Sequence, residues 1–217
     1  MAKSYTELEQ IIPQHIQENT SISLKTSALT NKVEKYILFA IESVLKKYNQ
    51  TRYIESAYTI TKEMATNGIK ANQKRVFFED EGLDITNEDH YRKGIGGYKE
   101  RFSEKMAEEY GLRCASRGVN VQINMQYNDT GLRIEAINNS PVIPAEESRL
   151  REKMKTSKKY NDIAEYYMEN MDNTEGAGLG IALIMILLKN ENIDPNNFSI
   201  STDKEKTTAK VEIPFTK

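Results

Sequence analysis

The chain has 217 residues, a formal net charge of −2, 38% hydrophobic residues and 29% charged residues. These values are typical of a globular domain with a substantial core, and they give no electrostatic reason to expect nucleic acid or an anionic membrane as a partner. The single cysteine, Cys114, excludes an internal disulfide framework, so we expect a plain buried thiol. The N-terminus lacks the apolar run of a signal peptide and no run approaches the ~20 residues of a membrane span, which predicts a cytoplasmic protein.

The N-terminal third predicts mainly helices. Residues 21–25 alternate weakly, as in a short strand, and residues 33–48 carry a helical apolar stripe. A second helix is predicted over 52–72. We therefore expect residues 1–50 to form a helical segment packed on a domain that spans residues 51–217.

The stretch 75–117 predicts less regular structure. A pair of phenylalanines opens it, a polar acidic segment follows, and glycines at 94–97 indicate a break before a helix near 98–110. The sequence assigns this stretch no role.

Two hairpins are predicted in the second half of the chain. Residues 119–127 alternate apolar and polar side chains, a turn signal follows at 129–131, and 132–136 continue as the second strand. Residues 198–202 and 209–215 predict a closing hairpin. Strands grouped in hairpins, with helices elsewhere, indicate an α+β fold built as a two-layer sandwich.

Between the hairpins lie a long amphipathic segment, 146–171, and a glycine cluster that leads into an apolar helix, 181–188. The expected apolar stripe of the amphipathic segment is Leu150, Met154, Ile163, Tyr167 and Met171. The cluster contains Gly176, Gly178 and Gly180. Missing Cβ atoms let a phosphate approach the backbone, and amide groups at a helix N-terminus bind anions. The spacing fits neither a Rossmann nor a Walker loop, and a tight turn before a buried helix is the structural alternative.

A second set of polar residues lies on the predicted helix 52–72. Glu63, Asn67 and Lys70 are spaced by four and seven positions, so they share one helical face. An amide oxygen can take part in Mg²⁺ coordination, a lysine can contact phosphate, and a carboxylate can act as general base. The same spacing is common on solvated helix faces, so alone it is a weak signal.

Together and in this order, these stretches resemble the GHKL group, whose Bergerat-fold domain is the ATP-binding half of histidine kinases. Residues 63–71 resemble the N box, 137–144 occupy the place of the first glycine box, 176–183 resemble the second glycine box, and 206–214 resemble the closing strand pair. The resemblance implies a two-layer α/β sandwich with a mixed sheet packed on helices. It also makes residues 75–117, which follow the N box, an inserted segment without a counterpart in the group's minimal domain.

The resemblance also implies ATP and Mg²⁺ as ligands. It makes Asn67 the magnesium-linked residue, Glu63 the catalytic base and Lys70 a phosphate contact. Further nucleotide contacts that it implies are Asn138, Gly176, Gly178, Leu179, Gly180 and Thr207. The segment 146–173 would be a mobile lid, whose basic side chains either reach phosphate or form a solvated face.

The chain departs from the group in the first glycine box. Asn138 stands where the group has an aspartate that accepts a hydrogen bond from the adenine amine, and Ser140 and Val142 replace two glycines. Lys206 replaces the glycine before Thr207. An amide oxygen still accepts a hydrogen bond but lacks the charge. Nucleotide binding is therefore expected to be weaker, altered in base preference, or lost.

Neither histidine, His15 nor His90, stands in a phosphoacceptor sequence, and we expect both to be exposed or locally bonded. Three functions stay open in signal transduction. The first is a kinase-like subunit that transfers phosphate from ATP to a histidine or serine of a separate protein. The second is an ATP hydrolase whose lid motion drives a partner. The third is an interaction module without turnover. A homodimer is compatible with each.

Overall fold

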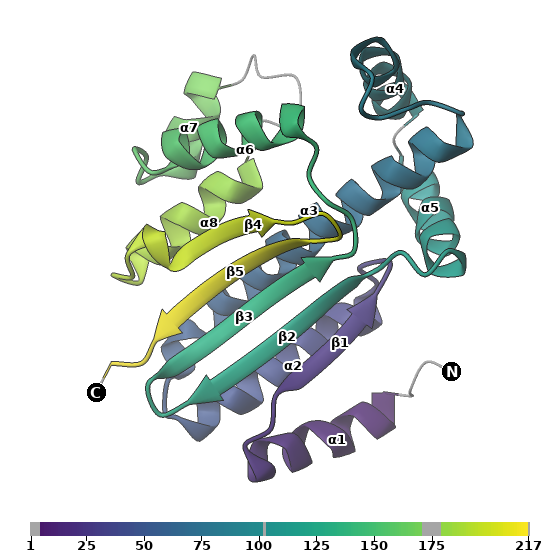
Figure 1. Cartoon of the computed structure of the whole chain (residues 1–217). Coiled ribbons are helices and arrows are strands. Elements are labelled where there is room, and N and C mark those ends of the chain that lie inside the picture. The colour runs from purple at the N-terminus through teal and green to yellow at the C-terminus, as the bar shows by residue number, and fades with distance from the viewer. Residues whose placement is uncertain (1–4, 102, 171–178, 217) are drawn as a thin grey trace.

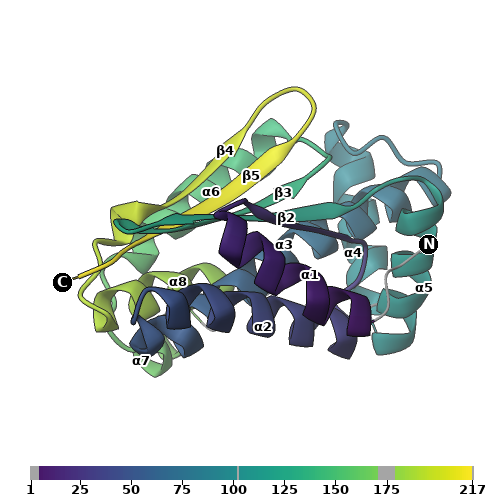
Figure 2. The same cartoon turned by 90° about the horizontal axis from the view of Figure 1, so that it is seen from below.

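The computed structural model describes residues 5–101, 103–170 and 179–216. A five-stranded sheet with the order β1-β2-β3-β5-β4 forms one layer, and helices cover one of its faces (Figures 1 and 2). The strands are β1 Ile22–Thr26, β2 Val121–Asn128, β3 Gly131–Asn138, β4 Phe198–Thr202 and β5 Thr207–Pro214. The two-layer α+β prediction is confirmed. The sheet is antiparallel at every neighbouring pair rather than mixed, because β1 also runs opposite to its neighbour.

The helices are α1 Tyr5–Glu18, α2 Asn31–Lys47, α3 Ile54–Asp80, α4 Glu88–Arg101, α5 Glu104–Ser116, α6 Pro144–Ser157, α7 Ile163–Asn170 and α8 Leu179–Asn190. Two short 3₁₀ helices, η1 Thr51–Tyr53 and η3 Pro195–Asn197, precede α3 and β4. Within the described ranges, no helix is both long and apolar enough to cross a bilayer.

The N-terminal segment contributes to the sheet as well as packing on it. Strand β1 pairs with β2 along the edge, and Thr30 caps α2 by accepting a hydrogen bond from the Val33 amide at 3.3 Å. Ile12, Ile22 and Ile37 are buried in the main core. The predicted helical segment 1–50 is thus joined to the following residues by one sheet and one core.

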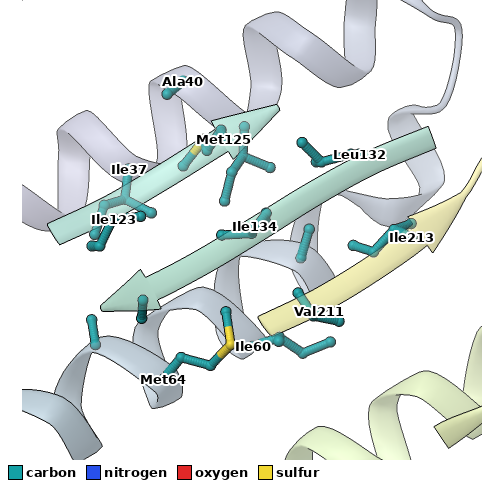
Figure 3. Packing of buried hydrophobic residues seen from close by; sticks show 14 of the residues in the cluster. Ile37, Ala40, Ile60, Met64, Ile123, Met125, Leu132, Ile134, Val211 and Ile213 are labelled. Carbon is teal, nitrogen blue, oxygen red and sulfur yellow. The ribbon is translucent and has the colours of Figure 1, made fainter. Parts of the chain in front are cut away.

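The core lies between the sheet and its helices. Alternate side chains of β2 and β3 point toward the helices, and they meet side chains of α2 and α3, as Figure 3 shows. Among these buried residues are Ile37, Ile60, Met64, Ile123, Met125, Leu132 and Ile134. Burying one such side chain stabilises the fold by about 1.5–3 kcal/mol. The alternation fixes which strand residues face the helices, and therefore places Asn138 on that side.

Helix α3 is longer than predicted because it continues past the sheet into a second small core. This core consists of Val76, Phe77, Phe78, Tyr91, Met106, Tyr110 and Cys114. The predicted glycine break at 94–97 is wrong, since those residues lie within α4. A Cβ atom on Gly94 would lie 2.3 Å from Cζ of Phe78, so this glycine allows α4 to pack on the ring. Cys114 is buried as expected, and burial raises the pKa of its thiol to about 11.

The amphipathic segment forms two helices instead of one. Leu150 and Met154 of α6 pack against the main core, as predicted. In α7, however, Tyr166 is 2% exposed and Tyr167 is 46% exposed, which reverses the expectation. The non-helical residues 158–162 shift the helical phase, so the apolar stripe of α6 does not continue in register. Met171 lies outside the described residues.

Candidate functional site

The predicted N-box residues lie in the middle of α3 and beside the start of α8. Glu63 is half-buried, and Asn67 and Lys70 are exposed. A Cβ atom on Gly180 would lie 2.6 Å from Oε2 of Glu63 and 3.3 Å from Nδ2 of Asn67. The structure therefore brings two of the predicted α3 residues together with Gly180.

Helix α8 is positioned by its apolar body. Leu179 and Gly180 open the helix, and Ile181, Ile184, Met185 and Leu188 anchor it among the buried residues. The first amide groups of a helix have no partner within it and carry partial positive charge. They lie at the end of α8 that adjoins Glu63 and Asn67. Gly176 and Gly178 of the predicted phosphate loop lie outside the described residues.

The side-chain oxygen atoms of Glu63 and Asn67 are hard ligands of the type that Mg²⁺ prefers. Mg²⁺ usually keeps several waters and binds one or two protein groups together with substrate phosphates. An exposed amide beside a half-buried carboxylate fits this coordination. Among the described residues there is no cluster of three or more His, Cys, Asp or Glu side chains placed for a metal.

Asn138 and Thr207 form the second part of the candidate site. They are partners across the β3–β5 ladder, and they are only 6% and 8% exposed. Gly68 of α3 lies beneath them, since a Cβ atom there would be 3.5 Å from Cβ of Asn138 and 2.9 Å from Cγ2 of Val121. Helix α3 thus links the Asn138 end of the sheet, through Gly68, with the Gly180 end of α8, through Asn67.

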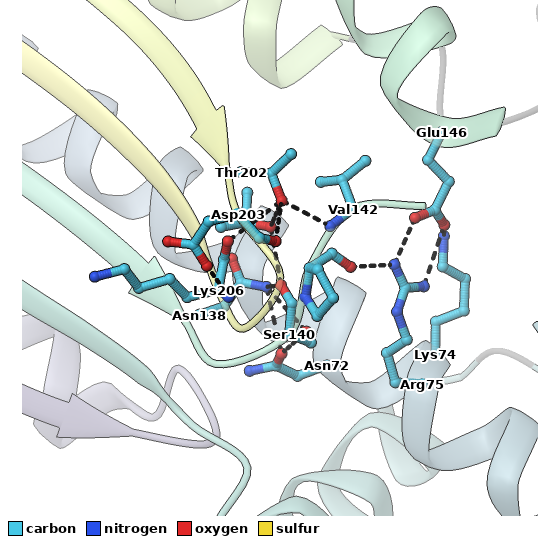
Figure 4. A network of polar contacts seen from close by, with 12 residues as sticks. Asn72, Lys74, Arg75, Asn138, Ser140, Val142, Glu146, Thr202, Asp203 and Lys206 are labelled. Carbon is cyan, nitrogen blue, oxygen red and sulfur yellow. Dashed lines mark hydrogen bonds and ion pairs between the residues drawn. The ribbon is translucent and has the colours of Figure 1, made fainter. Parts of the chain in front are cut away.

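A buried polar network surrounds Asn138 (Figure 4). The Nδ2 of Asn138 donates to the main-chain oxygen and to Oγ of Ser140, both at 3.1 Å. The Ser140 hydroxyl donates to Oδ1 of Asn72 at 2.7 Å, and the Thr207 hydroxyl donates to the Ser140 main-chain oxygen at 2.9 Å. Ser140, which stands where the resemblance to the GHKL group implies a glycine, therefore joins α3, β3 and β5.

Asn72 is a site residue that the sequence analysis missed. It is 2% exposed, and its Nδ2 donates to the main-chain oxygen of Asn120 at 3.0 Å. Together with Ile69 and Val76 it follows the buried side of α3 at spacings of three and seven. The available signal was an amide side chain at a position of the apolar stripe. Such a position is buried, and a buried polar group needs a hydrogen-bond partner.

The other two residues that differ from the GHKL pattern, Val142 and Lys206, also have structural partners. The amide of Val142 donates to Oγ1 of Thr202 at 3.1 Å, which ties the segment after β3 to the end of β4. The Lys206 amide donates to Oδ1 of Asp203 at 2.9 Å within the turn between β4 and β5. The bonds of Val142 to Thr202 and of Thr207 to Ser140 hold residues 140–142 against the β4–β5 hairpin.

A half-buried carboxylate at the start of α6, that of Glu146, was also missed. Glu146 accepts hydrogen bonds from Lys74 and from Nη2 of Arg75, the latter at 2.5 Å, and Arg75 also donates to the Pro141 main-chain oxygen at 3.0 Å. Burial raises the pKa of Glu146, but the hydrogen bond from Arg75 and the charges of Lys74 and Arg75 outweigh it and lower the pKa to about 2. The first turn of the predicted lid is therefore bound to α3.

Both histidines have local partners, as expected. Nδ1 of His15 lies 2.6 Å from Oγ1 of Thr20, and Nδ1 of His90 accepts a hydrogen bond from the Asp84 amide at 3.1 Å. A shallow concavity of about 430 Å³ lies at the opposite end of the sheet, around Asn128, Gly131 and Pro214. It contains none of the predicted site residues.

No family model matches the chain. Over 199 residues the chain is 28% identical to an uncharacterized protein of Treponema pallidum, an alignment that covers 92% of this chain and 39% of that protein. The chain thus spans about two fifths of that relative's length. Among solved structures it is similar to a chain in the crystal structure of the SiaB-SiaC complex from Pseudomonas aeruginosa, with a TM-score of 0.48 and 12% identity, covering 97% of this chain and 100% of that one.

Proposed function

We propose that this protein binds ATP with Mg²⁺ in a histidine-kinase-like nucleotide site and acts in signal transduction by transferring phosphate to a separate protein. The observation that carries the proposal is the contact between α3 and α8. Gly180, in the first turn of α8, lies against both Glu63 and Asn67. This is the juxtaposition that an N box and a second glycine box require for one shared phosphate site.

Each residue has a role that matches its surroundings. Asn67 is exposed and supplies an amide oxygen for Mg²⁺, and Lys70, one turn later, faces phosphate charge. The amides of the first turn of α8 bind phosphate oxygens. Glu63 accepts the proton of the attacking group. Phosphoryl transfer depends mainly on positioning the reacting groups and neutralising their charge. These residues supply the types of group that such a reaction needs.

A noncatalytic interaction module is the second candidate function. The polar network around Ser140 favours it, because residues at the positions of the family's bare glycines are engaged in contacts within the protein. Such contacts fill part of the region that a base would otherwise approach. The two candidates differ in whether nucleotide binds.

A thermal-shift titration of the protein with ATP, ADP and GTP, each with and without Mg²⁺, tests the proposal. A ligand that binds only the folded state stabilises it by about 2.7 kcal/mol at a hundredfold excess over Kd. We expect a Mg²⁺-dependent rise in Tm with ATP or ADP. No shift with any of the three nucleotides at millimolar concentration would favour the interaction module instead.

A further inference from the structure

We propose that Asn72 is a positioning residue: with Ser140 it fixes the carboxamide of Asn138 in one orientation, which sets the base preference of the nucleotide site. The favoured ligand is a nucleotide whose base carries an exocyclic amine, as adenine does. The inference rests on the proposed function, since it concerns the same site.

The orientation of Asn72 is dictated by the main chain. The carbonyl oxygen of Asn120 can only accept a hydrogen bond, so Asn72 must turn its Nδ2 toward it, at 3.0 Å. The Oδ1 of Asn72 therefore faces the other way, where it accepts from the Ser140 hydroxyl at 2.7 Å. That hydroxyl has a single hydrogen, which this bond uses.

The orientation of Asn138 follows from these two bonds. Its Nδ2 lies 3.1 Å from both oxygens of Ser140 and 3.5 Å from Oδ1 of Asn72. None of these three atoms can donate a hydrogen to Asn138. The Ser140 main-chain oxygen and Oδ1 of Asn72 carry no hydrogen, and the hydroxyl of Ser140 already donates to Asn72. A reversed Asn138 would place its own oxygen against three acceptors. The network therefore excludes the reversed amide.

The fixed amide leaves Oδ1 of Asn138 as the group presented to a ligand. This oxygen makes no hydrogen bond within the part of the chain that the structure describes, although the residue is only 6% exposed. A base with an amine at this position supplies the missing donor. A base with a carbonyl there places its oxygen against Oδ1 of Asn138, so two acceptors face each other. A site whose polar group has a fixed orientation discriminates strongly against such a base.

Inosine triphosphate is the matched probe, because it differs from ATP at one edge of the base, where an oxygen replaces the exocyclic amine and N1 carries a hydrogen. Calorimetric titrations with Mg²⁺ should give wild type at least about a tenfold preference for ATP over inosine triphosphate. In Asn72→Leu the Ser140 hydroxyl no longer donates to Asn72 and can donate to Oδ1 of Asn138 instead, so the amide of Asn138 gains freedom to reverse. We expect the preference to fall to within about threefold, partly because binding of inosine triphosphate improves.

Thr202→Val is the matched control, because it removes a hydroxyl from the same end of the sheet. That hydroxyl accepts a hydrogen bond from the Val142 amide and makes none with Asn138. It should keep the wild-type preference. Circular dichroism checks each fold, and Asn72→Ala takes the place of Asn72→Leu if the latter does not fold. An unchanged preference in the folded Asn72 variant, or equal affinities of wild type for the two nucleotides, overturns this inference and leaves the proposed function intact. Failure of wild type to bind either nucleotide overturns both.

Discussion

Gly180 at the start of α8 lies so close to Glu63 of α3 that a Cβ atom added to it would be 2.6 Å from the carboxylate oxygen Oε2. The two residues are 117 positions apart in the chain, and both belong to motifs predicted to act on one nucleotide. The absence of a side chain at Gly180 therefore determines where the carboxylate of Glu63 and the amide of Asn67 can lie.

Gly180→Ala should weaken nucleotide binding without unfolding the protein. The added methyl group meets the far end of a flexible side chain, so Glu63 shifts at small cost, and alanine favours a helix over glycine by about 1 kcal/mol. We expect a change in unfolding free energy below about 1 kcal/mol and a loss of Mg²⁺-nucleotide affinity of about tenfold or more. Denaturant melts and calorimetry measure the two quantities. Wild-type nucleotide affinity in this variant would show that Gly180 is not part of the nucleotide site.

Glu146→Gln should destabilise the protein by about 2–3 kcal/mol at neutral pH, because Lys74 and Arg75 lose the charge that balances them. The pKa of Glu146 is lowered from 4.5 to about 2, so its stabilising contribution is complete above pH 4.5 and is lost as the pH falls toward 2. Denaturant melts between pH 2 and 7 should show this acid-labile part in wild type and not in the variant.

Glu147→Gln is the control for that experiment. Glu147 is the next residue of α6 and pairs with Arg151 at the surface, with side chains that are 35% and 75% exposed. Removal of this pair should cost no more than about 0.5 kcal/mol. Equal effects of the two substitutions would show that Glu146 does not anchor α6.

Gly94→Ala should destabilise the second core by about 1–3 kcal/mol, since the added Cβ would overlap the ring of Phe78 and force that buried side chain or α4 to move. Gly96→Ala, two residues on in the same helix, meets nothing within 4 Å and should stabilise by up to about 1 kcal/mol. Chemical denaturation of the two variants measures the difference. Stabilisation by both substitutions would contradict the packing of α4 on Phe78.

Asn138→Asp should destabilise the protein by about 2 kcal/mol, even though the two side chains are nearly isosteric, because the carboxylate loses the amide hydrogens that Ser140 accepts and is itself buried. The deficit should shrink as the pH falls toward about 4, where the introduced carboxyl takes up a proton. Asn139→Asp is the matched control, because its oxygen, which accepts from the Asn120 amide at 2.8 Å, is kept, and the bond that it loses, from Nδ2 to the Gly118 main-chain oxygen at 3.0 Å, joins two exposed residues. It should cost less than about 1 kcal/mol, and equal losses would refute the orientation assigned to Asn138.

Periodicity predicted the elements that belong to the main core. The alternation of β2 and β3 and the stripe of α2 reflect a single buried face, and a single face leaves a regular pattern. The extension of α3 to Asp80 was missed because Val76, Phe77 and Phe78 serve a second core and interrupt the stripe. Gly94 reads as a break in sequence, whereas its role depends on an aromatic ring from another helix.

The candidate site was predictable where it follows a motif and not where it depends on a distant partner. The order of the boxes identified Glu63, Asn67 and Gly180, which the structure brings together. Asn72 and Glu146 were missed since their partners, Asn120 and Lys74, lie 48 and 72 positions away. For Asn72 the only local signal was its position on the apolar stripe of α3, whereas nothing in the local sequence distinguishes Glu146 from a solvated residue on a helix.

Calorimetric titration of Mg²⁺-ATP into wild type, Asn67→Ala and Glu55→Ala tests the central claim most directly. Asn67 and Glu55 are both exposed on α3, so neither truncation opens a cavity. The account predicts saturable binding to wild type and to Glu55→Ala, and a loss of at least about tenfold in Mg²⁺-dependent affinity for Asn67→Ala with an unchanged circular dichroism spectrum. Equal affinity of all three proteins, or no heat of binding to wild type at millimolar nucleotide, would contradict it.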